Sequence, residues 1–189
     1  MQLSNTESEL IEQMSKCYQF ENVNMLEHGQ AVHTAYLQLI EQLEGGEIII
    51  DLPPLVQAIY DKFKLKLEDA DTIRKYQIYH DCGKHLCRTV DEDGKQRFPN
   101  HAYYSALQYT NVFGVSVGSI LVIRDMDFHT MKGDELIDLC RQPLAITLYL
   151  TAWAEIIANS KMFGGYDSTS FKIKRKALIQ AGKKFQMEK

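Results

Sequence analysis

Histidines and carboxylates recur in this chain at positions where predicted helices turn an apolar face inward. The residues in question are His28, His80, Asp81, His101, Asp125, His129 and Glu155. Burying such groups is unfavourable unless they are paired or bound to a metal. A single inward histidine is most simply a hydrogen-bonded core residue. Seven such side chains in one chain favour a shared metal site.

Helical spacing indicates which way several of these side chains point. His28 begins an apolar stripe that continues through Val32, Ala35, Leu39 and Leu43. His33 lies about 140° further round the same predicted helix, so we do not expect it to bind the metal. Asp125 and His129 are four residues apart and are therefore predicted to share one helix face, a common way of presenting two ligands to one ion. Glu155 follows an apolar run, where a lone carboxylate requires a cation.

Helices are predicted for most of the chain, and the fold class is therefore all-α. Ser4 followed by Glu7 has the spacing of a capping box, and Gly83 is the expected end of the fourth helix. Residues 47–54 read as a brief extended stretch, and 84–99 as a loop or small hairpin. The helices are expected at about 4–18, 24–44, 54–64, 69–82, 100–112, 115–130, 134–141 and 144–162.

Length and composition indicate one soluble domain over residues 1–189, which number 189 and weigh 21.8 kDa. The net charge of −4 argues against stable binding to duplex nucleic acid, although the segment 166–189 is locally basic. The basic segment is read as a solvated helix face, or alternatively as a surface that holds substrate phosphates. A polar, acidic N-terminus and the lack of a long apolar run predict a cytoplasmic protein without a membrane span. The oligomeric state is left open.

The order of the candidate ligands resembles the signature of a known family. His28, then His80-Asp81 with Gly83-Lys84, then a carboxylate in a late helix, is similar to the H…HD…D pattern of the HD phosphohydrolase superfamily, over residues 24–165. YHDCGK and DEDGKQRFPNHAYYSA resemble a stretch in the HD domains of bacterial tRNA nucleotidyltransferases. His101 with the Asp125/His129 pair is similar to branches that hold two metals, including cyclic-dinucleotide phosphodiesterases.

Three features depart from the family's pattern. The last ligand of the family is normally Asp, whereas this chain has Glu155 in the matching context. Asp125 stands where two-metal members usually have a histidine. The interval from His28 to His80 is long, which indicates an insertion at about 45–54.

The resemblance implies a single HD-type helical domain and a metal-dependent phosphohydrolase acting on a nucleotide or nucleotide-like phosphate ester. Mononucleotides, dNTPs, cyclic nucleotides and 2′,3′-cyclic phosphate ends all remain open, because loop shape decides the substrate. Two other functions are also open. One is an inactive HD-fold protein that binds a metal or a nucleotide, and the other is a di-iron HD oxygenase.

The expected metal site has one or two divalent ions, and the mixed ligand set suits Mn, Fe, Co, Ni, Zn or Mg. The first ion is assigned to His28, His80, Asp81 and Glu155. A second, about 3.5–4 Å away, would use His101 with Asp125 or His129.

Three residues are expected to act on the substrate or on the attacking water. Asp81 would bridge the metals or orient the water. Lys84 would neutralise a phosphate oxygen, unless it is an ordinary surface lysine. His129, if it is not a ligand, would be the general acid.

Overall fold

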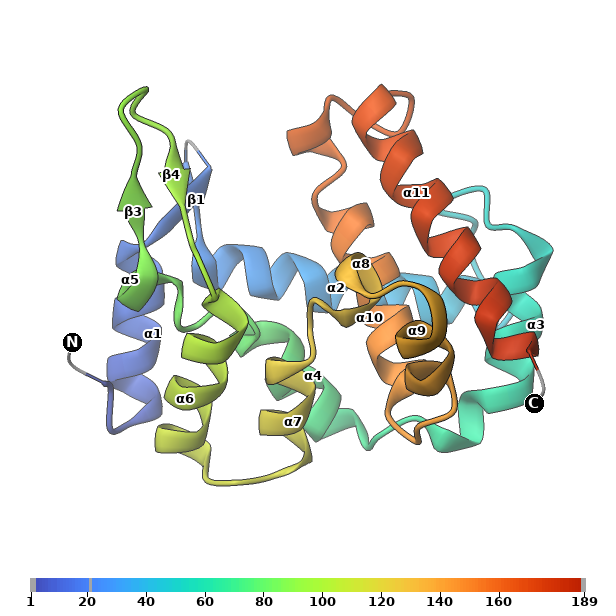
Figure 1. Cartoon of the computed structure of the whole chain (residues 1–189), viewed down its shortest axis with the longest axis horizontal. Coiled ribbons are helices and arrows are strands. Elements are labelled where there is room, and N and C mark those ends of the chain that lie inside the picture. The colour runs from blue at the N-terminus through green and yellow to red at the C-terminus, as the bar shows by residue number, and fades with distance from the viewer. Residues whose placement is uncertain (1–2, 21, 188–189) are drawn as a thin grey trace. The chain divides into compact units, whose positions relative to one another are not determined.

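The computed structural model describes residues 3–20 and 22–187, and helices make up most of them (Figure 1). The only strands in this part of the chain form two short hairpins, so the prediction of an all-α fold is confirmed. The described chain divides into two compact units, each discontinuous in sequence: 1–31 with 70–125, and 32–69 with 126–189. The prediction of one domain over the whole chain stays a prediction.

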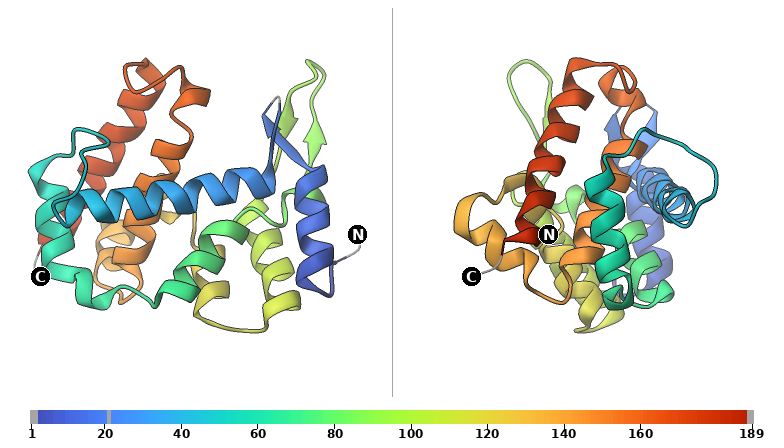
Figure 2. Two further views of the ribbon diagram at one scale, coloured as in Figure 1. Left: turned by 180° about the vertical axis from the view of Figure 1, so that it is seen from behind. Right: turned by 90° about the vertical axis from the view of Figure 1, so that its right-hand side faces the viewer.

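The first unit contains both hairpins, the first part of a long helix and several shorter helices. The hairpin β3–β4 pairs Thr89 with Arg97 and projects beyond the ends of α5 and α6 (Figure 2), so the expected hairpin within 84–99 is present. Helix α7 packs against both α4 and α6. The elements are α1 (Glu7–Lys16), β1 (Tyr18–Phe20), β2 (Val23–Asn24), the start of α2 (Met25–Leu43), α4 (Ala70–Tyr79), α5 (Lys84–Cys87), β3 (Thr89–Val90), β4 (Gln96–Arg97), α6 (His101–Phe113) and α7 (Val117–Ile123).

The second unit surrounds a buried central helix, α10 (Ala145–Ala158), in which nearly every side chain is buried. Helix α11 runs alongside α10, and the hydroxyl group of Tyr149 on α10 donates a hydrogen bond to the Leu178 carbonyl of α11 over 3.2 Å (Figure 1). The other elements are the rest of α2, α3 (Pro54–Phe63), η1 (Lys64–Lys66), α8 (Asp127–Thr130), α9 (Gly133–Cys140), η2 (Lys161–Phe163), α11 (Thr169–Gly182) and η3 (Lys183–Gln186).

Local capping explains where the first two helices begin. The predicted cap at Ser4 is wrong: α1 begins at Glu7, and the Thr6 hydroxyl accepts the Glu9 amide instead, over 3.2 Å. Ser4 is buried and its backbone is hydrogen bonded to the side chain of Gln108. At the start of α2, Asn24 and Glu27 exchange backbone-to-side-chain hydrogen bonds of 3.0 and 2.9 Å, which is the geometry of a capping box.

The predicted helix over 115–130 is wrong, because the structure divides this segment. Helix α7 ends at Ile123, and α8 begins at Asp127. The amide of Asp125 bonds to the carbonyl of Val122, three residues back, which closes the last turn tightly. Asp125 and His129 therefore do not share a helix face, and they belong to different units.

The basic segment forms α11 and η3 as far as it is described, while Glu188 and Lys189 lie outside the described residues. Its lysines at 172, 174, 176 and 183 are exposed, which fits a solvated helix face. None of the helices in the described part of the chain combines the length and apolar character that a membrane span requires.

Candidate metal centre

The His80-Asp81 pair lies in a tight turn that follows the end of α4 at Tyr79. The amides of Cys82 and Lys84 bond to the carbonyls of Tyr79 and Asp81, over 3.0 and 3.1 Å. Gly83 lets this turn lie directly on α6, since a β-carbon there would come within 2.2 Å of backbone atoms of α6. The Gly83 amide also donates to the Ser105 hydroxyl, over 3.0 Å. Gly83, in the YHDCGK stretch, is therefore a position where a side chain would collide with α6.

A second glycine brings α2 against α4. A β-carbon on Gly29 would lie 2.1 Å from the carbonyl oxygen of Ile78, so no larger residue fits without separating the two helices. The preceding residue, His28, is carried into contact with His80, and their ring centroids are 5.1 Å apart in an edge-on arrangement. His28 is 2% exposed, as its helical phase predicts.

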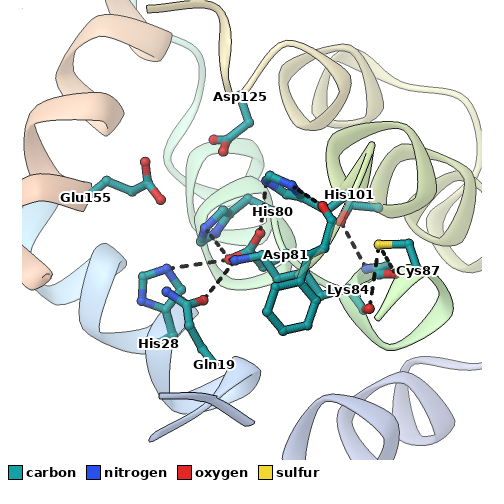
Figure 3. A network of polar contacts seen from close by, with 12 residues as sticks. Gln19, His28, His80, Asp81, Lys84, Cys87, His101, Asp125 and Glu155 are labelled. Atoms are coloured by element: carbon teal, nitrogen blue, oxygen red, sulfur yellow. Dashed lines mark hydrogen bonds and ion pairs between the residues drawn. The ribbon is translucent and has the colours of Figure 1, made fainter. Parts of the chain in front are cut away.

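Three imidazole rings surround the Asp81 carboxylate (Figure 3). The Nε2 atoms of His28 and His80 lie 3.6 and 3.3 Å from Oδ2 of Asp81. The Nε2 atom of His101 lies 3.7 Å from the other oxygen, Oδ1. His80 and Asp81 are almost completely buried, whereas the His101 side chain is 22% exposed. One carboxylate and three imidazole nitrogens thus converge from α2, the turn after α4, and α6.

Backbone carbonyls determine how two of these rings are protonated. Nδ1 of His80 lies 2.8 Å from the Gln77 carbonyl, and Nδ1 of His101 lies 3.1 Å from the Phe98 carbonyl. A carbonyl oxygen only accepts, so Nδ1 carries the proton in both rings. In a neutral imidazole the other nitrogen, Nε2, then presents a lone pair toward Asp81. A backbone partner of this kind orients histidine ligands in metal sites.

The Asp81 carboxylate is held in its charged form. Burial alone would raise the pKa of Asp81, but the ammonium group of Lys84, together with His80 and His28 in their protonated forms, outweighs burial and holds that pKa well below its usual range. Oδ1 of Asp81 is buried and accepts no hydrogen bond from any residue that the structure describes. A buried carboxylate oxygen without a hydrogen bond fits an atom that binds a cation.

The spacing of the ligand atoms also fits a metal ion. One donor atom each from His28, His80 and Asp81 lies within 4.8 Å of the others. Two ligands that are each about 2.1 Å from an ion are about 3.0–4.2 Å apart. The Nε2 atoms of His28 and His80, at 3.6 and 3.3 Å from Oδ2 of Asp81, already lie within that range. The described residues of the first unit therefore include a buried group that could hold a metal.

Lys84 is not a surface lysine. It is 8% exposed, and its ammonium group lies 2.6 Å from Oδ2 of Asp81 and 2.9 Å from Oε1 of Gln19 on β1 (Figure 3). Its nitrogen also lies 5.4 Å from the centre of the Phe98 ring. No feature of the sequence singles out Gln19, because a polar residue in a short strand is ordinarily solvated.

Asp125 is buried in the first unit, where it accepts a hydrogen bond from the Tyr76 hydroxyl over 2.5 Å. This contact ties the segment after α7 to α4 and explains why the helical pattern stops there, since a tertiary hydrogen bond outweighs local propensity. The second metal position, formed by His101 with Asp125 or His129, stays a prediction.

His129 and Glu155 both belong to the second unit, and they contact each other. Nε2 of His129 donates to Oε2 of Glu155 over 2.9 Å, and the two side chains are 16% and 15% exposed. Glu155 is thus not on the outside surface, and it has a histidine partner on α8. The predictions that Glu155 or His129 joins the metal ligands of the first unit stay predictions.

Comparison of the chain with family models, with curated proteins and with solved structures gave no significant match.

Proposed function

We propose that the protein is a metal-dependent phosphohydrolase of the HD type that acts on a nucleotide or nucleotide-like phosphate ester. The observation that carries the proposal is the convergence of three imidazole Nε2 atoms, at 3.3–3.7 Å, on the buried carboxylate of Asp81. The convergence adds geometry to a sequence order that resembles the HD signature.

The roles of the residues follow from their donors and burial. A divalent ion bound here would supply a water with a lowered pKa and would polarise a phosphoryl oxygen. His28 and His80 provide neutral nitrogen ligands, and Asp81 provides the negative charge. His101 is more exposed than His28 and His80, so it stands where a second ligand group or a substrate can approach.

Lys84 has two roles within this proposal. Before a metal binds, its ammonium group balances the buried charge of Asp81. With an ion bound to Asp81, the ammonium group of Lys84 would be available to a phosphate oxygen of the substrate, where it would stabilise the developing negative charge. Lys84→Ala should then slow turnover by on the order of 10²–10³-fold without emptying the metal site.

The same ion pair favours a second candidate, a binding protein without catalytic activity. An ammonium group 2.6 Å from Oδ2 of Asp81 can serve as a permanent cation in place of a metal. In that case the histidines and Asp81 form a buried polar core, and no divalent ion is needed for folding or function.

A metal-by-substrate screen separates the two candidates. Metal-free protein would be loaded with Mn, Fe, Co, Ni, Zn or Mg in turn and offered nucleoside mono-, di- and triphosphates, cyclic nucleotides and 2′,3′-cyclic phosphates. We expect the wild type to cleave at least one phosphate ester, and a chelator should abolish that cleavage. Asp81→Asn should have no activity, although its circular dichroism spectrum should remain that of a helical protein. Absence of cleavage across the screen, together with absence of bound metal, would support the binding protein instead.

The chain offers a matched control for the ligand assignment. His28 and His33 lie on the same helix; Nε2 of His28 lies 3.6 Å from Oδ2 of Asp81, whereas His33 belongs to the second unit. His28→Ala should lower metal occupancy and turnover, whereas His33→Ala should leave both near the wild-type values. Loss of metal in Glu155→Ala would add Glu155 to the ligands, and unchanged occupancy would remove it from them.

A further inference from the structure

A cavity in the second unit has the lining of a small-molecule site. It has a volume of about 260 Å³ and lies among α8, α9 and the C-terminal part of α11. Every lining residue belongs to the second unit. The cavity is larger than the roughly 150 Å³ that accommodates benzene in an engineered protein cavity, so it has room for an aromatic ring and a small polar group.

The two sides of this cavity differ in character. Its floor is apolar and includes Phe128, Leu136 and Ala181, each of which is at most 6% exposed. Its polar lining includes Lys132 and Lys184, and no aspartate or glutamate is among the lining residues. An apolar floor beside two positive charges suits a ligand that is apolar at one end and anionic at the other.

The described residues do not neutralise the charge of the lining. The structure gives neither Lys132 nor Lys184 an ion pair with any residue that it describes, and the contact of the Lys184 ammonium group is with the sulfur of Met187. Another cavity of this unit, of about 410 Å³, is also lined by bases, but its Lys172 and Arg175 are paired with Asp167 and Asp51. The positive charge of the smaller cavity is therefore available to a ligand.

His129 adds a fixed polar group to the same cavity. Because its Nε2 atom donates to Glu155 over 2.9 Å, the orientation of the ring is set before any ligand enters. Gln180 on α11 contributes an amide that can donate a hydrogen bond. Two lysines together carry a charge of about +2, which matches a phosphate group of about −1.5 to −2 at pH 7.

We propose that this cavity binds a small phosphate monoester or phosphonate whose organic group is apolar, such as an aryl phosphate. The phosphate lies between Lys132 and Lys184, and the organic group rests on Phe128 and Leu136. The inference does not depend on the proposed phosphohydrolase activity, because the residues that carry it, Lys132, Lys184, Phe128 and Leu136, are not among the candidate metal ligands or catalytic residues.

The probe for this proposal is phenylphosphonate, which has no ester bond to hydrolyse, titrated calorimetrically into the full chain with a chelator present. We expect saturable binding of about one equivalent, weaker binding of methylphosphonate by roughly tenfold because it lacks the ring, and no detectable binding of benzyl alcohol. Lys132→Ala and Lys184→Ala should each weaken phenylphosphonate binding by about tenfold.

Two further variants complete the test. Lys183→Ala removes an exposed lysine of the same segment that does not line the cavity, and it should change the affinity by less than about twofold. Ala177→Trp fills the cavity from an exposed position and should abolish binding while leaving the circular dichroism spectrum unchanged. Equal affinity for methyl- and phenylphosphonate, equal effects of the three lysine variants, or full binding by Ala177→Trp would overturn the proposal.

Discussion

Removing the charge of Asp81 should destabilise the protein because it leaves the ammonium group of Lys84 buried without its counter-ion. The two charged atoms are 2.6 Å apart, and the side chains are 2% and 11% exposed. Coulomb's law gives about 6 kcal/mol for this separation at an effective dielectric constant of about 20. Desolvation offsets part of this attraction, and breaking a buried pair by removing one partner typically costs about 3–5 kcal/mol. We therefore expect Asp81→Asn to lower the free energy of unfolding by that amount.

A double-mutant cycle measures the coupling directly. The free energy of unfolding would be determined by urea denaturation, with a chelator present, for the wild type, Asp81→Asn, Lys84→Met and the double variant. Because Lys84→Met removes the uncompensated charge, the double variant should recover at least about 2 kcal/mol relative to additivity.

An exposed pair in the same unit provides the control for this cycle. Lys75 and Asp71 on α4 are 2.8 Å apart, but their side chains are 35% and 59% exposed. The cycle through Asp71→Asn and Lys75→Met should give a coupling below about 1 kcal/mol, as is usual for exposed ion pairs. Additive effects within about 0.5 kcal/mol at both pairs would refute the reasoning, because Lys84 would then not depend on Asp81.

Three further predictions concern packing and pH. Gly29→Ala places a β-carbon 2.1 Å from a backbone carbonyl of α4, so it should destabilise the protein by about 1–3 kcal/mol in urea denaturation and weaken metal binding. Burial, and then the hydrogen bond to Glu44, raise the pKa of Tyr60 to about 12. The contribution of the Tyr60 hydroxyl group to the free energy of unfolding is therefore complete below about pH 10 and is lost as the pH rises to 12. Between pH 9 and pH 11, the free energy of unfolding should fall less for Tyr60→Phe than for the wild type. Tyr76→Phe removes the hydroxyl group that donates to the buried carboxylate of Asp125 and should cost about 1–3 kcal/mol, whereas an unchanged free energy of unfolding would show that the bond is not formed.

Much of the fold could be predicted from the sequence because the strongest signals are local. The apolar period placed α2 and the inward position of His28 correctly, and α3 begins at Pro54 as predicted. The prediction that the fourth helix continues to Cys82 and ends at Gly83 is wrong, because α4 ends at Tyr79 and a tight turn follows it. The helix over 115–130 could not be predicted correctly, because a hydrogen bond from Tyr76 to Asp125, 49 residues apart, decides where it stops.

The environment of Asp81 could likewise be predicted only in part, because some of its contacts depend on residues far apart in the sequence. Residue type and helical position make His28, His80 and His101 candidate metal ligands, and in the structure all three lie around the carboxylate of Asp81. Lys84 was singled out by its place after Gly83, but its contact with Gln19 depends on how β1 folds back, which no local pattern records. Gly29 carried a usable signal, since a glycine inside an apolar helix often marks a close approach to another backbone.

Metal occupancy of the purified chain tests the central claim most directly. Metal-free wild type, Asp81→Ala, His28→Ala and His33→Ala would be dialysed to equilibrium against Mn²⁺, Zn²⁺ or Fe²⁺ in separate experiments, and the bound metal would be determined by mass spectrometry. Our account predicts one or two ions per wild-type chain, the same number for His33→Ala, and a loss of bound ion for Asp81→Ala and His28→Ala. A wild-type chain that binds no Mn²⁺, Zn²⁺ or Fe²⁺, or an Asp81→Ala variant that binds as much as wild type, would contradict the claim.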